Sequence, residues 1–174
     1  MSEEVYEPQE IEHAPPRMSQ VIAVIAALLG TLLTVPFAIF AIPFGIAGFV
    51  AIAVGLFYTH SRAWLTTGTG LVLCGALVTG AYGGIPPALM LVGIGAMIIG
   101  WDVGQHGIVI GKQLGRTTRS QRNQLIHTAT TVLVVAVIST GAYVSYLFAG
   151  GGRPAAAVAV VVLGVVVVAW VFRS

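Results

Sequence analysis

Charge is what this sequence has least of. Only 8% of its 174 residues are Asp, Glu, Lys or Arg, against about 25% in ordinary soluble domains. A soluble fold of this size has to cover its surface with polar side chains, and 57% of the residues here are apolar. The composition therefore excludes a soluble globular enzyme, a nucleic-acid-binding protein and a disordered chain. It predicts an all-α integral membrane protein whose solvent is the lipid bilayer.

Cysteine and catalytic motifs are also scarce. The single cysteine, Cys74, lies in an apolar segment, which excludes an internal disulfide bond and a multi-cysteine metal site. The sequence contains no Walker motif, no G-x-S-x-G motif and no H-E-x-x-H motif. His60, His106 and His127 occur without the spacing of a zinc site. We therefore expect a protein that is not an enzyme, with no catalytic residue, no cofactor and no bound metal.

Acidic residues are almost confined to one end of the chain. Five of the six lie within the first 12 residues, and Asp102 is the only carboxylate after them, against all eight basic residues. The N-terminal stretch also contains three prolines and little that could pack in a core. We expect residues 1–17 to form a disordered acidic cytoplasmic tail and residues 18–174 to form a transmembrane helical bundle.

The bundle divides into six expected transmembrane helices. Residues 21–58 carry no charge, and as one helix they would extend about 57 Å across a hydrocarbon core of about 30 Å. We expect two helices joined by a turn at Pro36, with Pro43 kinking the second, because proline disrupts a helix interior. A single crossing by this run, which leaves five helices, is the alternative. The expected spans are residues 19–35, 37–58, 64–82, 86–103, 125–148 and 155–172, with a basic cytoplasmic connection over 104–124.

Basic residues predict the orientation of these spans, because they concentrate on the cytoplasmic side of a membrane. With six spans, seven of the eight basic residues fall on one side. We therefore expect a multi-pass protein of the cell membrane with both termini in the cytoplasm. The seven residues are Arg17, Arg62, Lys112, Arg116, Arg119, Arg122 and Arg173, and Arg153 falls on the other side.

Residues 100–116 differ from the rest of the apolar sequence. Their glycines, at positions 100, 104, 107, 111 and 115, are three or four residues apart and fall on one face of a helix. Such a stripe lets another helix approach closely, and something has to cover it because glycine weakens a helix. We expect this helix to continue past the membrane or bend onto its surface, with span 125–148 folded back on the stripe. A partner protein or a second copy on the stripe is the alternative.

Asp102 lies in the same segment, near the cytoplasmic end of its span. An ionisable residue at membrane depth is a functional candidate. His106 follows four residues later on the same helix face, and three arginines come after it. We interpret Asp102 first as a structural lock with an arginine or a histidine, and second as a proton-coupling or ligand-binding group.

The run from Lys112 to Arg122 carries four positive charges. We expect it to face anionic lipid headgroups, with the acidic tail of the chain or an acidic partner as alternatives. The run is short and lacks interleaved aromatic residues, so we expect no nucleic-acid partner.

In this segment the chain resembles a family of small uncharacterised membrane proteins of halophilic archaea. The shared features are a W-D-x-G block at 101–104, a G-x-Q-L-G-R block at 111–116 and an arginine-rich stretch that leads to His127. The resemblance implies residence in the cell membrane. It also implies association with a gene group encoding a MoxR-type AAA+ ATPase, a von Willebrand-like domain protein and a transglutaminase-like membrane protein. It implies no catalytic residue, because no activity is established for the family.

These observations favour a non-enzymatic scaffold or accessory subunit of a membrane complex. Residues 100–122 would contact membrane-protein partners, a second copy or an AAA+ ATPase-linked complex. The alternative is a component of a small-solute or ion transporter or channel that uses Asp102 and His106. The candidate interaction residues are Trp101, Asp102, Gly104, His106, Gly107, Gly111, Gln113, Gly115, Arg116, Arg119 and Arg122.

Overall fold

A computed structural model describes residues 14–82, 84–114 and 121–148 of the chain. Within these residues the fold is all-α, and five of its helical segments are long and apolar enough to cross a membrane. One of the five segments is the short 3₁₀ helix η1 together with α2. The elements are α1 (Arg17–Thr34), η1 (Ile39–Ala41), α2 (Ile42–Phe57), α3 (Arg62–Tyr82), α4 (Pro87–Leu114) and α5 (Gln121–Phe148).

The first apolar run forms two helices, as its length predicts. α1 ends at Thr34, Pro36 lies in the turn that follows, and η1 leads into α2. The expected kink at Pro43 is wrong, because α2 begins at Ile42 and Pro43 lies in its first turn. Proline is tolerated there, since the first turn of a helix has no partner for the missing N–H.

α4 extends well beyond the span expected for it. It begins at Pro87, and the Met90 N–H donates to the carbonyl of Pro86 at 3.1 Å. It then runs unbroken for 28 residues to Leu114, which is about 42 Å against a hydrocarbon core of about 30 Å. The first half of the connection expected over 104–124 is therefore helix, and residues 115–120 lie outside the described part of the chain.

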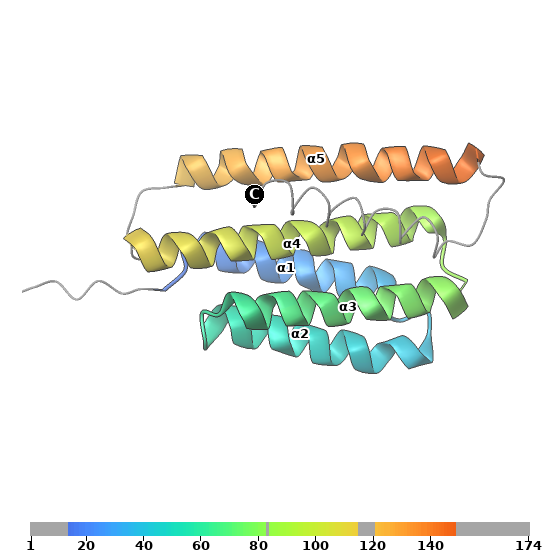
Figure 1. Cartoon of the computed structure of the whole chain (residues 1–174), viewed down its shortest axis with the longest axis horizontal. Coiled ribbons are helices and arrows are strands. Elements are labelled where there is room, and N and C mark those ends of the chain that lie inside the picture. The colour runs from blue at the N-terminus through green and yellow to red at the C-terminus, as the bar shows by residue number, and fades with distance from the viewer. Residues whose placement is uncertain (1–13, 83, 115–120, 149–174) are drawn as a thin grey trace, which may run out of the picture.

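The five long helices lie side by side (Figure 1). α1 packs mainly on α4, α2 packs mainly on α3, and α4 joins both pairs to α5. The start of α1, the turn between α2 and α3, the end of α4 and the start of α5 all lie at the left of Figure 1. We call this the polar end of the bundle, because it holds Arg17, Arg62, Lys112 and Arg122.

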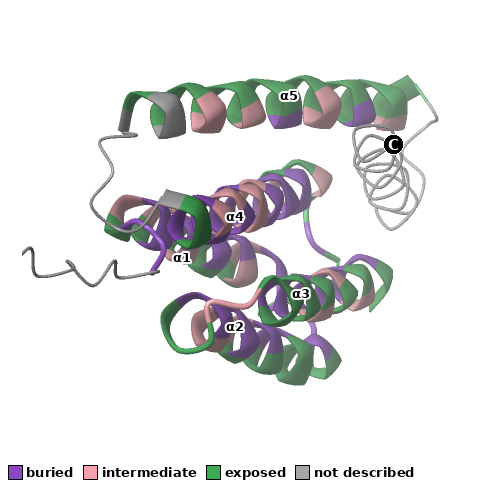
Figure 2. Cartoon of the chain, turned by 60° about the vertical axis from the view of Figure 1, so that its left-hand side comes forward, coloured by how far each residue is buried: buried purple, intermediate pink, exposed green. Residues whose placement is uncertain are grey.

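Buried side chains concentrate in the first four helices, whereas α5 is largely exposed (Figure 2). One apolar cluster contains residues of the first four helices, among them Ile52, Leu65 and Met97. A second cluster joins α3, α4 and α5 and includes Ile94 and Val135. In an apolar 18-residue window of each helix, 61% of the residues are buried in α4 and 6% in α5. α4 is thus the central helix of the described bundle, and α5 lies at its edge.

The residues just before α1 belong to the packed structure. Ala14, Pro15 and Pro16, which the sequence assigns to the acidic tail, are buried. The carbonyl of Ala14 lies directly against Gly111 of α4. The rest of the expected tail, residues 1–13, and the expected sixth span, residues 155–172, lie outside the described residues.

Candidate functional site

α4 contacts three helices with three different faces. Residues three or four positions apart share one face of a helix, and α4 places a different chemistry on each face. Gly93 and Gly100 face α1, Trp101 and Gln105 face α3, and Asp102 and His106 face α5. The candidate residues of this helix are therefore divided among three interfaces rather than gathered on one surface.

The glycine stripe faces α1, so the expectation that span 125–148 covers it is wrong. A Cβ at Gly100 would lie 2.9 Å from the carbonyl oxygen of Ala23, and one at Gly111 would lie 2.6 Å from that of Ala14. Because those oxygens are backbone atoms, only glycine permits so close an approach. The described part of the stripe is already covered and is not open to a partner protein. Its other members are Gly104 and Gly107, and Gly115 lies outside the described residues.

The face toward α3 carries a connected set of hydrogen bonds. The Gln105 amide donates to Thr66 Oγ1 at 2.7 Å and to the backbone carbonyl of Arg62 at 3.3 Å. Arg62 Nε donates back to Gln105 Oε1, and Trp101 Nε1 donates to Thr66 Oγ1 at 3.2 Å. Gln105 is buried, and a buried amide is stable only when its polar atoms have partners. Trp101, predicted as an interaction residue, therefore fastens α4 to α3.

The face toward α5 carries a cluster that we call the Asp102 cluster, consisting of Asp102, His106, His127 and Thr131. Asp102 Oδ2 accepts a hydrogen bond from Thr131 Oγ1 at 2.6 Å and lies 2.9 Å from His127 Nε2. The imidazole rings of His106 and His127 stack with centroids 4.1 Å apart and planes 19° from parallel. The sequence allowed either an arginine or a histidine beside Asp102, and in the described chain the neighbour is a histidine of α5.

The geometry around His127 limits what this cluster can do chemically. Nε2 lies within ion-pair distance of Asp102 but lacks the alignment of a hydrogen bond. The attraction is therefore electrostatic and is strong only when His127 carries a proton. The side chains of His127 and Asp102 are 37% and 31% exposed, but the Nε2 atom that faces the carboxylate is buried. Two stacked rings cannot both carry charge without repulsion, and the arrangement suits one proton rather than two.

A third set of contacts ties α1 to the turn between α2 and α3. Gln20 Nε2 donates to the carbonyl of Leu56 at 2.8 Å, and His60 Nδ1 donates to the same carbonyl at 3.0 Å. His60 has a φ of 46°, an uncommon conformation outside glycine, and its ring bond supports the turn. All five long helices are therefore linked at the polar end by hydrogen bonds or ion-pair contacts of polar side chains.

Three hydroxyl groups away from these joints bond within their own helix, whereas the buried hydroxyls of Thr69 and Thr79 have no hydrogen-bond partner among the described residues. Thr31, Thr34 and Ser145 each donate to the carbonyl four residues earlier in the same helix, which satisfies the hydroxyl without a second helix. Thr66 and Thr131 differ, because each also bonds to a side chain of α4. Side-chain bonds between helices thus occur where the sequence offers Gln20, Gln105 and Asp102.

The basic residues at the polar end point outward. Arg17, Lys112 and Arg122 are exposed, as is Gln113. Arg116 and Arg119 lie outside the described residues. Arg62 bonds to Gln105, whereas the other three described cations of this end suit contact with headgroups or with an acidic surface.

Two residues of this end were missed from the sequence. Gln105 was not selected because a lone glutamine carries no charge, yet a single amide in an apolar helix needs partners nearby. Thr131 is one of several hydroxyls in an apolar helix, and nothing in its local sequence distinguishes it. A usable signal existed, because Asp102 and His106 are spaced like His127 and Thr131, and antiparallel neighbours joined by a short connection bring such pairs together. The sequence named His127 only as a weak metal candidate.

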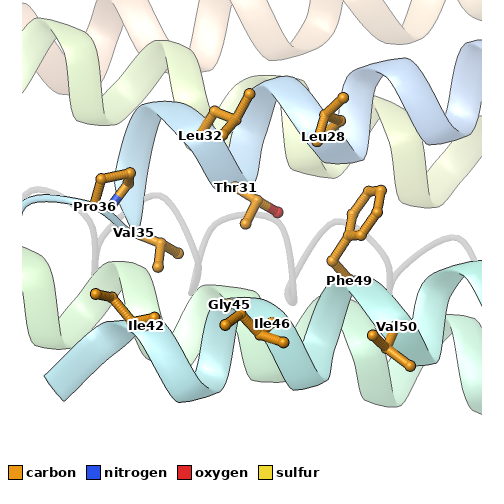
Figure 3. A pocket seen from close by; sticks show the side chains of 10 residues that line it. All are labelled: Leu28, Thr31, Leu32, Val35, Pro36, Ile42, Gly45, Ile46, Phe49 and Val50. Carbon is orange, nitrogen blue, oxygen red and sulfur yellow. The ribbon is translucent and has the colours of Figure 1, made fainter. Parts of the chain in front are cut away.

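An apolar groove lies toward the opposite end of the bundle, between α1 and α2 (Figure 3). Its volume is about 380 Å³, and side chains such as Val35, Pro36 and Phe49 line it. The hydroxyl of Thr31, its polar lining side chain, already donates to the Ala27 carbonyl at 2.8 Å. The groove is therefore suited to contact with lipid chains rather than to a polar ligand.

Comparison with known protein families identifies the family of this chain. Residues 13–169 match the family described as "Family of unknown function (DUF7519)". The chain belongs to that family. No curated protein and no solved structure matches it. The DUF7519 match spans all five described helices, so the α4 interfaces belong to the region that defines the family.

Proposed function

We propose that this DUF7519 protein is a non-enzymatic scaffold or accessory subunit of a membrane complex, with its polar end in the cytoplasm. The orientation rests on Arg17, Arg62, Lys112 and Arg122, which share that end, because basic residues concentrate on the cytoplasmic side. With the sixth span expected over 155–172, both termini lie in the cytoplasm. The exposed Lys112 and Arg122 then meet anionic headgroups or an acidic partner.

The exposed face of α5 carries this proposal. Gly141 is exposed with no atom within 4 Å of where a Cβ would stand, and Ser145 follows one turn later. Small residues four apart are the usual means by which membrane helices approach each other. The same chain uses this device between α2 and α3, where a Cβ at Gly48 would lie 2.6 Å from the carbonyl oxygen of Gly68. We therefore assign the Gly141 face of α5 to a helix of a partner membrane protein.

The proposed contact surface differs from the one expected from the sequence. α1 and the residues just before it cover the described glycines of 100–111, so the described cytoplasmic part of the surface reduces to the exposed Lys112, Gln113 and Arg122. The resemblance to halophilic archaeal proteins makes the MoxR-type ATPase gene group the first set of partners to test. In that assembly α5 contacts the membrane-embedded partner, and the basic end contacts a cytoplasmic one.

The test compares two exposed glycines that differ only in their helix. Gly141→Leu on α5 and Gly70→Leu on α3 both introduce a side chain into open space, so neither should disturb the fold of the monomer. Each tagged variant is extracted in native lipid particles, and co-purified proteins are quantified by mass spectrometry. We expect a stoichiometric membrane partner with the wild type and Gly70→Leu, and its loss with Gly141→Leu.

Two outcomes contradict the proposal. Equal recovery of the partner with both variants would show that α5 is not the contact. A cysteine at Gly141 that forms a disulfide with cysteines placed in residues 155–172 would show that the chain covers this face itself. In either case the scaffold role would lose the observation that supports it.

A second candidate function is a component of a proton-coupled or ion-coupled transporter. The observation that favours it is the Asp102 cluster, which places a carboxylate beside two histidines within the candidate membrane spans. Such groups mark proton and ion pathways in membrane proteins. Asp102→Asn should then abolish pH-driven flux in proteoliposomes while leaving the recovery of partner proteins unchanged. If the protein is a scaffold, proteoliposomes with the wild type and with Asp102→Asn should show the same ion permeability.

A further inference from the structure

We propose that the Asp102 cluster is a proton-binding site that controls how tightly α5 is held against α4. The bound ligand is one proton, carried by the His127 imidazole against the Asp102 carboxylate. Such a site acts on a single helix–helix joint, whether the protein is a scaffold or a transporter component. Beyond either role, the site gives α5 two positions, one with a proton on His127 and one without it.

The cluster joins two helices whose shared interface is smaller than that between α1 and α4. α5 buries the smallest share of its residues among the described helices, and its contacts with α4 are far fewer than those between α1 and α4. Both residues that α5 contributes, His127 and Thr131, lie near its start. The apolar contacts of Val135 and Ala142 lie further along the same face. A change in the cluster therefore acts on the end of α5 nearest the polar end.

The joint contains only one strong interaction that depends on protonation. The hydrogen bond from Thr131 to Asp102 persists whether or not His127 is charged. The contact between His127 Nε2 and Asp102 Oδ2 has ion-pair distance without hydrogen-bond alignment. It is strong when His127 is an imidazolium and weak when the ring is neutral. Imidazole is the side chain that changes charge between about pH 5 and 8.

The other described charged groups of the polar end lie away from this joint. From α4, Asp102 and His106 face the interface, and from α5 His127 faces it. Arg62 of α3 is bonded to Gln105 on a different face of α4, and Lys112 and Arg122 are exposed. His106 stacks on the ring of His127 without contributing a second charge, because two adjacent imidazolium rings repel.

The direction of the response follows from these contacts. Below the titration of His127 the ring carries its proton, the ion pair forms, and α5 lies close to α4. As pH rises the proton is lost, the ion pair disappears, and only the Thr131 hydrogen bond and the apolar contacts remain. Because the ion pair forms only in the closed arrangement, protonation and closure favour each other in this proposal. The ratio of closed to open molecules should change by up to about tenfold per pH unit, as expected for one proton.

The experiment measures both the proton and the helix. The full chain is placed in lipid nanodiscs with Cys74 replaced by serine, and spin labels are attached at the exposed positions Gln113 and Leu125. Pulsed electron–electron double resonance then measures the α4–α5 distance at a series of pH values from 5 to 8. In parallel, ¹⁵N-histidine spectra follow the four histidines of the chain, assigned by single substitutions. We expect His127 to titrate and the distance distribution to lengthen above the same midpoint.

Matched variants separate charge from fold. Asp102→Asn keeps an oxygen that accepts from Thr131 but removes the charge, so the distance should no longer depend on pH. His127→Gln should act in the same way. His106→Phe keeps the ring stack and should keep the response. His60→Asn is the control, because asparagine tolerates a positive φ and position 60 lies in the α2–α3 turn rather than at the α4–α5 interface.

Three results would overturn the proposal. A His127 resonance that does not titrate between pH 5 and 8 would remove the proton from the site. A titrating His127 with an unchanged distance would show that the proton does not move α5. A response that survives in Asp102→Asn, or disappears in His106→Phe, would assign the proton to a different group.

Discussion

The α1–α4 interface and the α4–α5 interface use opposite chemistry on neighbouring faces of one helix. Toward α1, α4 presents glycines that bring two backbones into contact, as between Gly100 and the Ala23 carbonyl. Toward α5, α4 presents Asp102 and His106, which contact side chains of the other helix. Close backbone contact dominates the first interface, whereas the second combines one glycine contact, between Gly95 and Val135, with polar side chains near the polar end.

The difference matters because lipid supplies no hydrophobic drive between helices. Backbone contact through glycine gains dispersion energy along the whole helix, and no protonation or rotamer change can release it. A polar joint is weaker, since hydrogen bonds between membrane helices contribute about 0.6 kcal/mol on average. It can, however, respond to charge. We infer that α1–α4 is the permanent frame and that α5 is the adjustable helix.

The largest effect should come from a side chain introduced into the glycine interface. In Gly30→Val, the new Cβ would lie 2.7 Å from the carbonyl oxygen of Gly93 and 3.0 Å from the backbone nitrogen of Met97. Neither backbone atom can move without displacing α4. Overpacking of this kind costs about 1–3 kcal/mol, and we expect the upper part of that range. Reversible unfolding in detergent–lipid micelles measures the loss.

Gly70→Val is the control for that prediction. Gly70 is also helical, and nothing lies within 4 Å of the place that its Cβ would take, so the change in unfolding free energy should stay within about 0.5 kcal/mol. If the two valines destabilise the protein equally, helix propensity rather than close contact would explain the glycines. The contrast between the two α4 interfaces would then lose its physical basis.

Much of this fold could be predicted from the sequence because lipid imposes simple rules. The length of the charge-free run 21–58 required two helices, and Pro36 marked their turn. Pro43 was misjudged because its position relative to the helix start depends on where η1 ends, which propensity does not specify. The glycine face of α4 was also correctly identified as a close-contact face from spacing alone.

The partner of that face could not be predicted, and the reason is topological. Glycine spacing shows that a helix will pack there, but it does not say which one. The sequence favoured the next helix along the chain, whereas α1 fills the position. Asp102 was similarly found as an isolated carboxylate, while Gln105 and Thr131 required knowledge of which faces of α3 and α5 meet α4. Pairing between helices distant in sequence is the information that a single sequence lacks.

A smaller effect should follow from breaking the polar joint between α4 and α3. Gln105→Leu removes the acceptor of Arg62 Nε and the amide that donates to Thr66. Because Gln105 is buried, we expect a loss of about 1–2 kcal/mol in unfolding free energy. Gln113→Leu, the same substitution at an exposed position of α4, should change it little. Equal losses would mean that α4 does not depend on this joint.

The smallest effect should come from one hydroxyl of the α4–α5 interface, and two adjacent threonines allow it to be isolated. Thr131 Oγ1 donates to Asp102 at 2.6 Å, whereas Thr130 Oγ1 donates only within α5, to the Ile126 carbonyl at 2.9 Å. Valine has nearly the same shape, so Thr131→Val should cost about 0.6 kcal/mol and Thr130→Val almost nothing. Hydrogen exchange of the α5 amides should rise in Thr131→Val while exchange in α1 stays unchanged. An equal rise in both helices would show that α5 is part of the permanent frame, because its attachment could not then be loosened separately from the α1–α4 interface.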